Sequence, residues 1–207
     1  MASDRLTGAA PAVREAKYKR RYGEILNAAA AVFAHKGYHG ASTKDIADRL
    51  GIRQGSLYYY FPSKEEALEE VCRIGLDGFF KGLEAIVNGD GPPTAKLRAA
   101  VFNHMEPLGT RHHYVKVFHN ERHNLTGDAL ADIKDRVDEY EALLDRLLAE
   151  GVRAGALRGD LDRRLSVLAV LGLCNAAMDW FDPARGNIAG IADQYAEILI
   201  GGLAVTR

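Results

Sequence analysis

The sequence has no apolar run long enough to cross a membrane. Its longest mostly apolar stretch covers residues 165–173, whereas a spanning helix needs about 20 residues. The first residues include Asp4 and Arg5 and form no continuous apolar segment, so we expect no secretory signal and a cytoplasmic protein. The only two cysteines, Cys72 and Cys174, are far apart and suit neither a metal site nor a redox pair. We therefore expect both to be buried in a reducing compartment.

The sequence also lacks the alternation of apolar and polar residues that is typical of half-buried β-strands. Apolar residues recur instead at spacings of three and four, which predicts an all-α protein of about nine helices. The clearest break between predicted helices is Gly-Asp-Gly-Pro-Pro at 89–93, and Pro-Leu-Gly at 107–109 predicts another. A chain of 207 residues buries roughly 70% of its unfolded surface, which is enough for one large core or two small ones.

The net charge of −1 conceals an uneven distribution of charge. Residues 1–64 contain 11 Lys and Arg against 5 Asp and Glu, whereas residues 65–207 contain 16 against 23. A basic N-terminal part followed by an acidic body is typical of a phosphate-binding module attached to a regulatory or dimerising domain.

Two short predicted helices flank Gly51, and this arrangement is typical of a helix-turn-helix. Ser42 stands three positions before Asp45, which predicts a capped helix beginning at Thr43. The second helix is expected over residues 54–60. In such motifs the second helix enters the major groove of DNA while the first crosses the backbone.

We expect the polar residues of this motif to contact DNA. Arg and Gln suit paired hydrogen bonds with base edges, which favours Arg53 and Gln54 as base readers. Gly55 would let the backbone approach DNA, and hydroxyl or ammonium groups suit phosphate oxygens. The predicted DNA-binding residues are Thr43, Lys44, Arg53, Gln54, Gly55, Ser56, Tyr58, Tyr59 and Lys64.

The aromatic run and the basic start of the chain have a second interpretation. Tyr60 and Phe61 are expected to pack in the core, because helical spacing points them toward the preceding helices. Lys17 and Arg21, with the cations between them, are either solvated or in contact with phosphate.

Three motifs carry a resemblance to a known family. They are Phe-Ala-His-Lys-Gly-Tyr at 33–38, Ser-Thr-Lys-Asp-Ile-Ala at 42–47, and the run from Gly51 through Tyr58-Tyr59-Tyr60-Phe61-Pro62 to Glu65. With these motifs, residues 21–66 resemble the TetR family of bacterial transcriptional repressors. The resemblance implies a three-helix DNA-binding head, a long fourth helix, a helical effector-binding body and a homodimer formed by the last two long helices.

This resemblance sets the expected domain boundaries. We predict a disordered arm over residues 1–13, a helix-turn-helix domain over 14–62 and an effector-binding and dimerisation domain over 63–207. The sequence departs from the family at Arg53, where such proteins often have a Ser or Thr that caps the recognition helix. Arg53 therefore predicts either a less firmly fixed helix start or an additional base reader.

Five of the seven His lie between residues 104 and 123, and Glu121 is the only acid between Leu108 and Asp128. His119 and His123 have the spacing of a metal-ligand pair, but no third ligand stands at a suitable spacing, so we predict no metal. Solvated or buried His is one interpretation of the cluster, and a binding site for an anionic effector is the other. The candidate effector-binding residues are His104, Arg111, Phe118, His119, Arg122, His123 and Trp180.

The C-terminal region carries a second resemblance. Residues 175–183, 191–199 and 202–203 are similar to the C-terminal half of TetR relatives that control fatty-acid, steroid or aromatic-acid catabolism, several of which sense acyl-coenzyme A. The resemblance implies an acyl-CoA or another lipid or aromatic-acid derivative as a non-covalent effector, with no further cofactor. Apolar stripes on predicted helices at 161–181 and 188–204 form either the homodimer interface or internal core.

These observations predict a ligand-responsive repressor that binds a palindromic DNA operator as a homodimer and is released by a small molecule. A metal-assisted hydrolase that uses the His-rich helix is the first alternative, but the sequence has no matching base, nucleophile and orienting group. A nucleoid-type DNA-binding protein without an effector is the second alternative, but such a protein would have a basic body, whereas this body is acidic. Because the catalytic groups of a hydrolase are missing, we expect the protein not to be an enzyme.

Overall fold

The protein is described by a computed structural model over residues 11–205. This part of the chain contains nine α-helices, one short 3-10 helix and no β-strand, which confirms the predicted all-α fold. Within the same range, no helix is both long and apolar enough to cross a membrane. The elements are α1 (Pro11–Gly40), α2 (Thr43–Leu50), α3 (Gln54–Leu57), α4 (Lys64–Asn88), α5 (Pro93–Thr110), α6 (His112–Glu121), η1 (Arg122–Asn124), α7 (Gly127–Arg153), α8 (Arg163–Trp180) and α9 (Ile188–Leu203).

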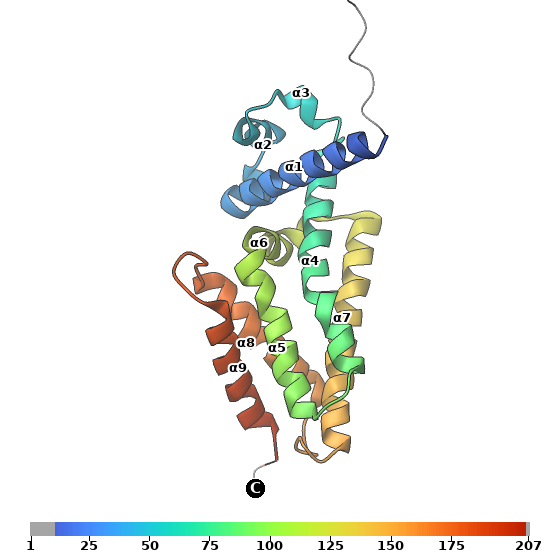
Figure 1. The fold of residues 1–207 in the computed structure, drawn as a ribbon, viewed down its shortest axis with the longest axis vertical. Helices are drawn as coiled ribbons and strands as arrows, with labels where there is room; N and C mark the ends of the chain where they lie inside the picture. The colour runs from blue at the N-terminus through green and yellow to red at the C-terminus, as the bar shows by residue number, and fades with distance from the viewer. Residues whose placement is uncertain (1–10, 206–207) are drawn as a thin grey trace, which may run out of the picture.

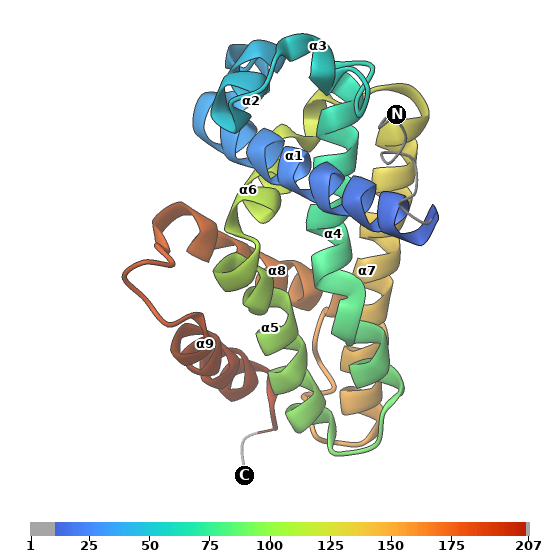
Figure 2. The same ribbon diagram turned by 45° about the horizontal axis from the view of Figure 1, so that its top comes forward.

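The helices form a small head and a longer helical body (Figure 1). The head consists of α1, α2 and α3, with α1 crossing near the upper end of α4. The body consists of α4 to α9, in which α5 packs along α4 on one side and α9 on the other. The short helix α6 packs against both α1 and α4, so it touches the head and the body at once (Figure 2).

Helix α1 begins within the expected arm and has a kink near its end. Residues 11–13, which we expected in the arm, form the first turn of α1, and the rest of the expected arm lies outside the described residues. Gly37 interrupts the helical backbone with φ 70° and ψ 164°, a region that essentially only glycine enters. The chain then continues to Gly40 in a new direction.

In the helix-turn-helix, the first helix begins with a side-chain cap, whereas the second does not. The predicted capping box of α2 is confirmed, because the Ser42 side chain accepts from the Asp45 N–H and the Asp45 carboxylate accepts from the Ser42 N–H. Gly51 ends α2 with φ 64° and ψ 32°, a left-handed cap. Helix α3 is shorter than predicted and begins after Arg53, whose side chain makes no capping hydrogen bond. The recognition helix, which lacks the Ser or Thr cap common in the TetR family, is thus only four residues long.

One continuous apolar core joins the head to the body. Ile46 and Leu57 lock α2 and α3 together, and both are almost completely buried. Phe61 is buried as predicted, whereas Tyr60 is half-buried and stacks on Tyr18 with ring centroids 5.4 Å apart. Because head and body share this core, a shift of a body helix reaches the head through direct packing.

The predicted helix break at 107–109 is wrong, because α5 continues through Pro107 to Thr110. Proline removes one backbone donor and normally interrupts a helix. Here the proline ring is buried against α4 at Gly78, where an added Cβ would lie 3.5 Å from it. Burial of the ring against this bare backbone helps to offset the lost hydrogen bond.

Candidate nucleic-acid interface and ligand cavity

Three of the predicted DNA-binding residues meet at the start of the helix-turn-helix. The Gln54 side-chain amide donates to the Thr43 hydroxyl at 2.8 Å. The Tyr58 hydroxyl lies 3.4 Å from both the Gln54 amide nitrogen and the Thr43 oxygen. This exposed network orients the Gln54 amide before any DNA arrives, which reduces the entropy that its ordering would cost on binding.

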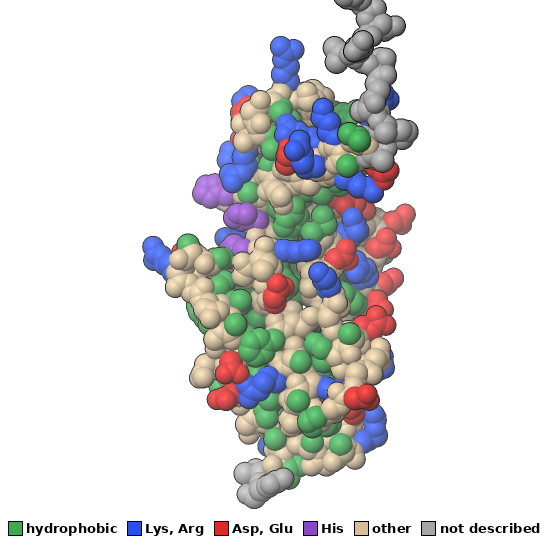
Figure 3. All heavy atoms as spheres, viewed as in Figure 1, with side chains coloured by type: hydrophobic (Ala, Val, Ile, Leu, Met, Phe, Trp, Pro, Cys, Tyr) green, Lys and Arg blue, Asp and Glu red, His purple; other side chains and the backbone are tan. Residues whose placement is uncertain are grey.

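The other predicted residues of this surface are exposed, with one exception. Arg53, Ser56 and Tyr59 are open to solvent, and the Tyr59 ring is 74% exposed. Lys44 is exposed and pairs with Asp48 on the same helix, so its ammonium has an acidic neighbour in the free protein. In the space-filling view, Lys and Arg side chains gather over the head (Figure 3).

Lys64 is the exception, because its ammonium is directed into the protein. It donates to the backbone carbonyls of Tyr38 at 3.0 Å and Ala41 at 3.2 Å, and it lies 4.2 Å over the Tyr38 ring. These contacts tie the start of α4 to the end of α1. The ammonium therefore has a structural role that the sequence does not predict, and only one of its three donors remains for phosphate.

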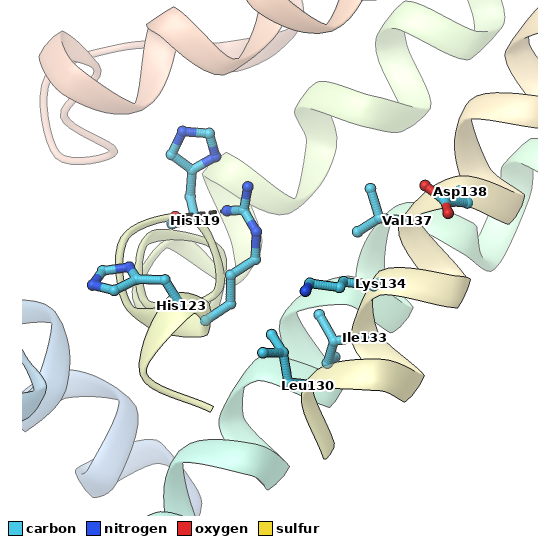
Figure 4. A pocket seen from close by; sticks show the side chains of 8 residues that line it. His119, His123, Leu130, Ile133, Lys134, Val137 and Asp138 are labelled. Carbon is cyan, nitrogen blue, oxygen red and sulfur yellow. Dashed lines mark hydrogen bonds between the residues drawn. The ribbon is translucent and has the colours of Figure 1, made fainter. Parts of the chain in front are cut away.

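The body contains an outer cavity of about 360 Å³ between α6 and α7 (Figure 4). His119 and His123 lie on one side of it, and Lys134 lies on the α7 side. The complete lining is His119, Arg122, His123, Leu130, Ile133, Lys134, Val137 and Asp138. Two permanent cations and two His against one acid make this cavity suitable for an anion.

An inner cavity of about 110 Å³ adjoins the outer one, and the two share His119, Arg122 and Val137. Its other lining residues are Leu76, Phe79, His104, Phe118, Tyr140, Glu141, Leu171 and Asn175. The inner cavity is thus mostly apolar, with a few polar groups that could orient a ligand.

His104 forms the polar centre of the inner cavity. Its Nε2 lies 3.0 Å from the Asn175 side-chain oxygen, which can only accept, so Nε2 carries the proton. The other ring nitrogen then accepts from the Tyr140 hydroxyl at 2.9 Å. The Phe79 ring stacks on the imidazole with centroids 4.7 Å apart. Burial lowers the pKa of His104 to about 4, so the ring is neutral at physiological pH.

The structure brings together five of the seven predicted effector-binding residues. His104, Phe118, His119, Arg122 and His123 line the two cavities. Arg111 stands at the start of α6 and Trp180 at the end of α8, and neither contributes to the lining.

Sequence reasoning missed Tyr140, Asn175 and Lys134, which come from α7 and α8. Asn175 lies in the segment that carries the C-terminal resemblance, and this was the only feature of the sequence that could have indicated any of the three. Within the described residues, no three His, Cys, Asp or Glu side chains are close enough to hold a metal ion.

We predict that His104 makes the folded state sensitive to mild acid. In the unfolded chain a His takes up a proton near pH 6.5, whereas in the folded protein the His104 pKa is about 4. Its contribution to stability is complete above pH 6.5 and is lost as the pH falls toward 4, by about 3 kcal/mol in all. Urea unfolding at a series of pH values should show this loss in the native protein and a flatter profile in His104→Gln. Parallel pH profiles would contradict the assignment.

Comparison with known protein families agrees with this architecture. The family described as "Bacterial regulatory proteins, tetR family" matches residues 25–71, and "Tetracyclin repressor-like, C-terminal domain" matches residues 90–203. The chain is 31% identical over 183 residues to the HTH-type transcriptional repressor KstR2 of Rhodococcus jostii, which covers 87% of this chain and 90% of the relative.

Two solved structures are similar over most of their length. The ketosteroid transcriptional regulator KstR2 of Mycobacterium tuberculosis superposes with a TM-score of 0.85 and 30% identity over 90% of this chain and 96% of that chain. AibR in complex with isovaleryl coenzyme A and operator DNA gives a TM-score of 0.77 and 28% identity over 87% of this chain and 98% of that chain. The chain therefore belongs to the TetR family of transcriptional regulators, and it is a DNA-binding regulator rather than an enzyme.

Proposed function

We propose that this protein is a repressor that binds a palindromic operator as a homodimer in the cytoplasm and is released from it by an anionic small molecule. The observation that carries the proposal is the position of α6. This helix forms a wall of the ligand cavities and packs against α1 of the head. A ligand in the cavities is therefore separated from the DNA-binding head by one helix, α6.

The proposed homodimer is supported by the open faces of α8 and α9. Leu165, Leu168, Trp180 and Ile198 are all between 45% and 63% exposed, although they are large apolar residues. A monomer rarely leaves so many such side chains in one region exposed to water. Small residues between them, such as Gly172, would let a second copy pack closely. Leu199, which the apolar stripe predicted at 188–204 includes, is buried in the core and does not belong to this open face.

Two heads on one dimer would explain how a four-residue recognition helix achieves selective binding. One head buries too little surface for tight binding, whereas two heads one helical turn apart read a palindrome. In each head, Gln54 and Arg53 would read bases, and Tyr58, Tyr59 and Lys44 would contact phosphates.

For the effector, we propose a coenzyme A thioester. The outer cavity offers Arg122 and Lys134 to phosphates, and the inner cavity offers an apolar space for the acyl group, with Asn175 and His104 at its polar centre. Its modest volume of about 110 Å³ favours a short or compact acyl group. AibR, whose fold is similar, has been solved with isovaleryl coenzyme A and operator DNA.

Release would follow from movement of the cavity walls. Leu76 and Phe79 of α4 line the inner cavity, and the N-terminal end of α4 holds the head through Lys64. A ligand that fits best with a different tilt of α4 or α6 would disfavour the spacing of the heads that fits DNA. Such coupling is typically about 1–3 kcal/mol, and it cannot exceed the difference in ligand affinity between the two spacings.

Base reading is tested by Gln54→Ala on an operator recovered by selection from random DNA. We expect a loss of about 1–3 kcal/mol in operator affinity and a relaxed preference at one position in each half-site, because the amide would no longer read that base. Lys44→Ala is the matched control and should weaken all sequences alike. If Gln54→Ala weakens operator and random DNA equally, Gln54 is not a base reader.

The effector class is tested by Arg122→Ala with isovaleryl coenzyme A as the probe. We expect calorimetric affinity to fall by about 10-fold to 100-fold, because a charge-assisted hydrogen bond to phosphate is worth about 1.5–3 kcal/mol. Arg111→Ala changes a nearby cation outside both cavities and should alter affinity less than about twofold. A native protein that binds neither this thioester nor free coenzyme A would refute the effector class and leave DNA binding unaffected.

A further inference from the structure

Glu121, the only acid between Leu108 and Asp128, makes contacts with the head. It is half-buried at the end of α6. One of its carboxylate oxygens accepts from the backbone N–H of Tyr38 at 3.0 Å and from the Asn124 side-chain amide at 3.1 Å. Tyr38 lies in the last part of α1, 83 positions earlier in the chain. This carboxylate is therefore a direct polar link between the helix that lines the cavity and the DNA-binding head.

The kink at Gly37 explains why this amide is available. In an uninterrupted helix, the Tyr38 N–H would donate to the carbonyl four residues earlier. The backbone angles of Gly37 redirect the chain, and a buried or half-buried N–H needs another acceptor. An ionised carboxylate is a stronger acceptor than a carbonyl, so Glu121 stabilises the kinked arrangement.

Tyr38 is also held by α4. Its carbonyl accepts from the Lys64 ammonium, and its hydroxyl donates to the Glu65 carboxylate at 2.6 Å. The end of α1 is thus fixed at one residue by two body helices. Of these three side chains that hold Tyr38, only Glu121 comes from α6.

The turn that carries Glu121 also carries cavity residues. The Arg122 guanidinium donates to the carbonyls of His119 at 2.6 Å and Phe118 at 3.3 Å, and both residues line the inner cavity. An anion that draws the guanidinium into the outer cavity would compete with these two carbonyls. It would therefore act on the same helical turn that holds the Tyr38 amide.

We propose that Glu121 is a positioning residue for operator binding, which holds each head in the orientation that the operator requires through the Tyr38 amide. The inference rests on the proposed repressor function and adds the contact through which α6 exerts its control. Without this link, the head would sample more orientations. The apparent dissociation constant would rise in proportion to the loss of the competent fraction, by about 10-fold if one molecule in ten remains competent.

The proposal predicts an effect opposite in sign to that of charge alone. Removal of a negative charge from a DNA-binding protein should strengthen its attraction to DNA. We expect Glu121→Ala instead to weaken operator binding by about 10-fold, because orientation is lost. Binding to random DNA, which needs no fixed spacing of two heads, should be unchanged or slightly tighter.

Two further variants separate position from charge and from general packing. Glu121→Gln removes the same charge but keeps an oxygen that can accept from the Tyr38 N–H, so its operator affinity should stay within about threefold of the native protein. Tyr114→Phe removes the other side-chain hydrogen bond between α6 and α1, from the Tyr114 hydroxyl to Asn27 at 2.8 Å. This hydrogen bond lies away from the kink, so Tyr114→Phe should leave operator affinity within about twofold of that of the native protein.

The experiment measures each variant on the selected operator and on random DNA, with thermal melting and hydrogen exchange at the Tyr38 amide as readouts of the contact. If Glu121→Ala melts below the working temperature, Glu121→Ser, which is too short to reach the amide, replaces it. Native-like operator binding by a variant with faster Tyr38 exchange would overturn the inference, and so would equal losses on operator and random DNA. A native protein without any operator preference would refute the proposed function itself, a result visible before any variant is made.

Discussion

The close approach of α6 to α4 is the constraint on which the rest of the structure depends. A Cβ at Gly75 of α4 would lie 2.7 Å from the Tyr114 carbonyl oxygen and 2.9 Å from the Phe118 Cβ, so only glycine permits this packing. Because α6 is held so tightly, it can serve both as a cavity wall and as a support for α1. Cavity and head are therefore parts of one packed unit, and a displacement in one is transmitted to the other as packing strain.

The chemical character of the two cavities follows from the same arrangement. The turn at the end of α6 places Arg122 between the cationic outer cavity and the apolar inner one. Neutral His104, held by Tyr140 and Asn175, adds polarity at the centre without adding charge. A ligand with an anionic part and a compact apolar part would satisfy both cavities. Its binding would act on the helix that supports the head.

Local features of the fold were predictable from sequence, whereas contacts between distant segments were not. The cap at Ser42 and the stop at Gly51 depend on neighbouring residues, and both predictions are confirmed. The continuation of α5 through Pro107 depends on a bare stretch of α4, which no local pattern reveals. Glu121 was notable in the sequence as the only acid between Leu108 and Asp128, but its partner is a backbone amide that becomes available only because of the kink at Gly37.

The packing of α6 between the cavities and α1 implies that ligand binding and DNA binding are energetically coupled. This coupling is tested by measuring four affinities with the coenzyme A thioester that binds most tightly among a panel. Two are the affinities of the protein for the operator with and without this thioester, and two are its affinities for the thioester with and without the operator. We expect the thioester and the operator each to weaken the binding of the other by the same factor, on the order of 5-fold to 150-fold, because coupling is reciprocal. Both ligands binding simultaneously, each with unchanged affinity, would contradict it.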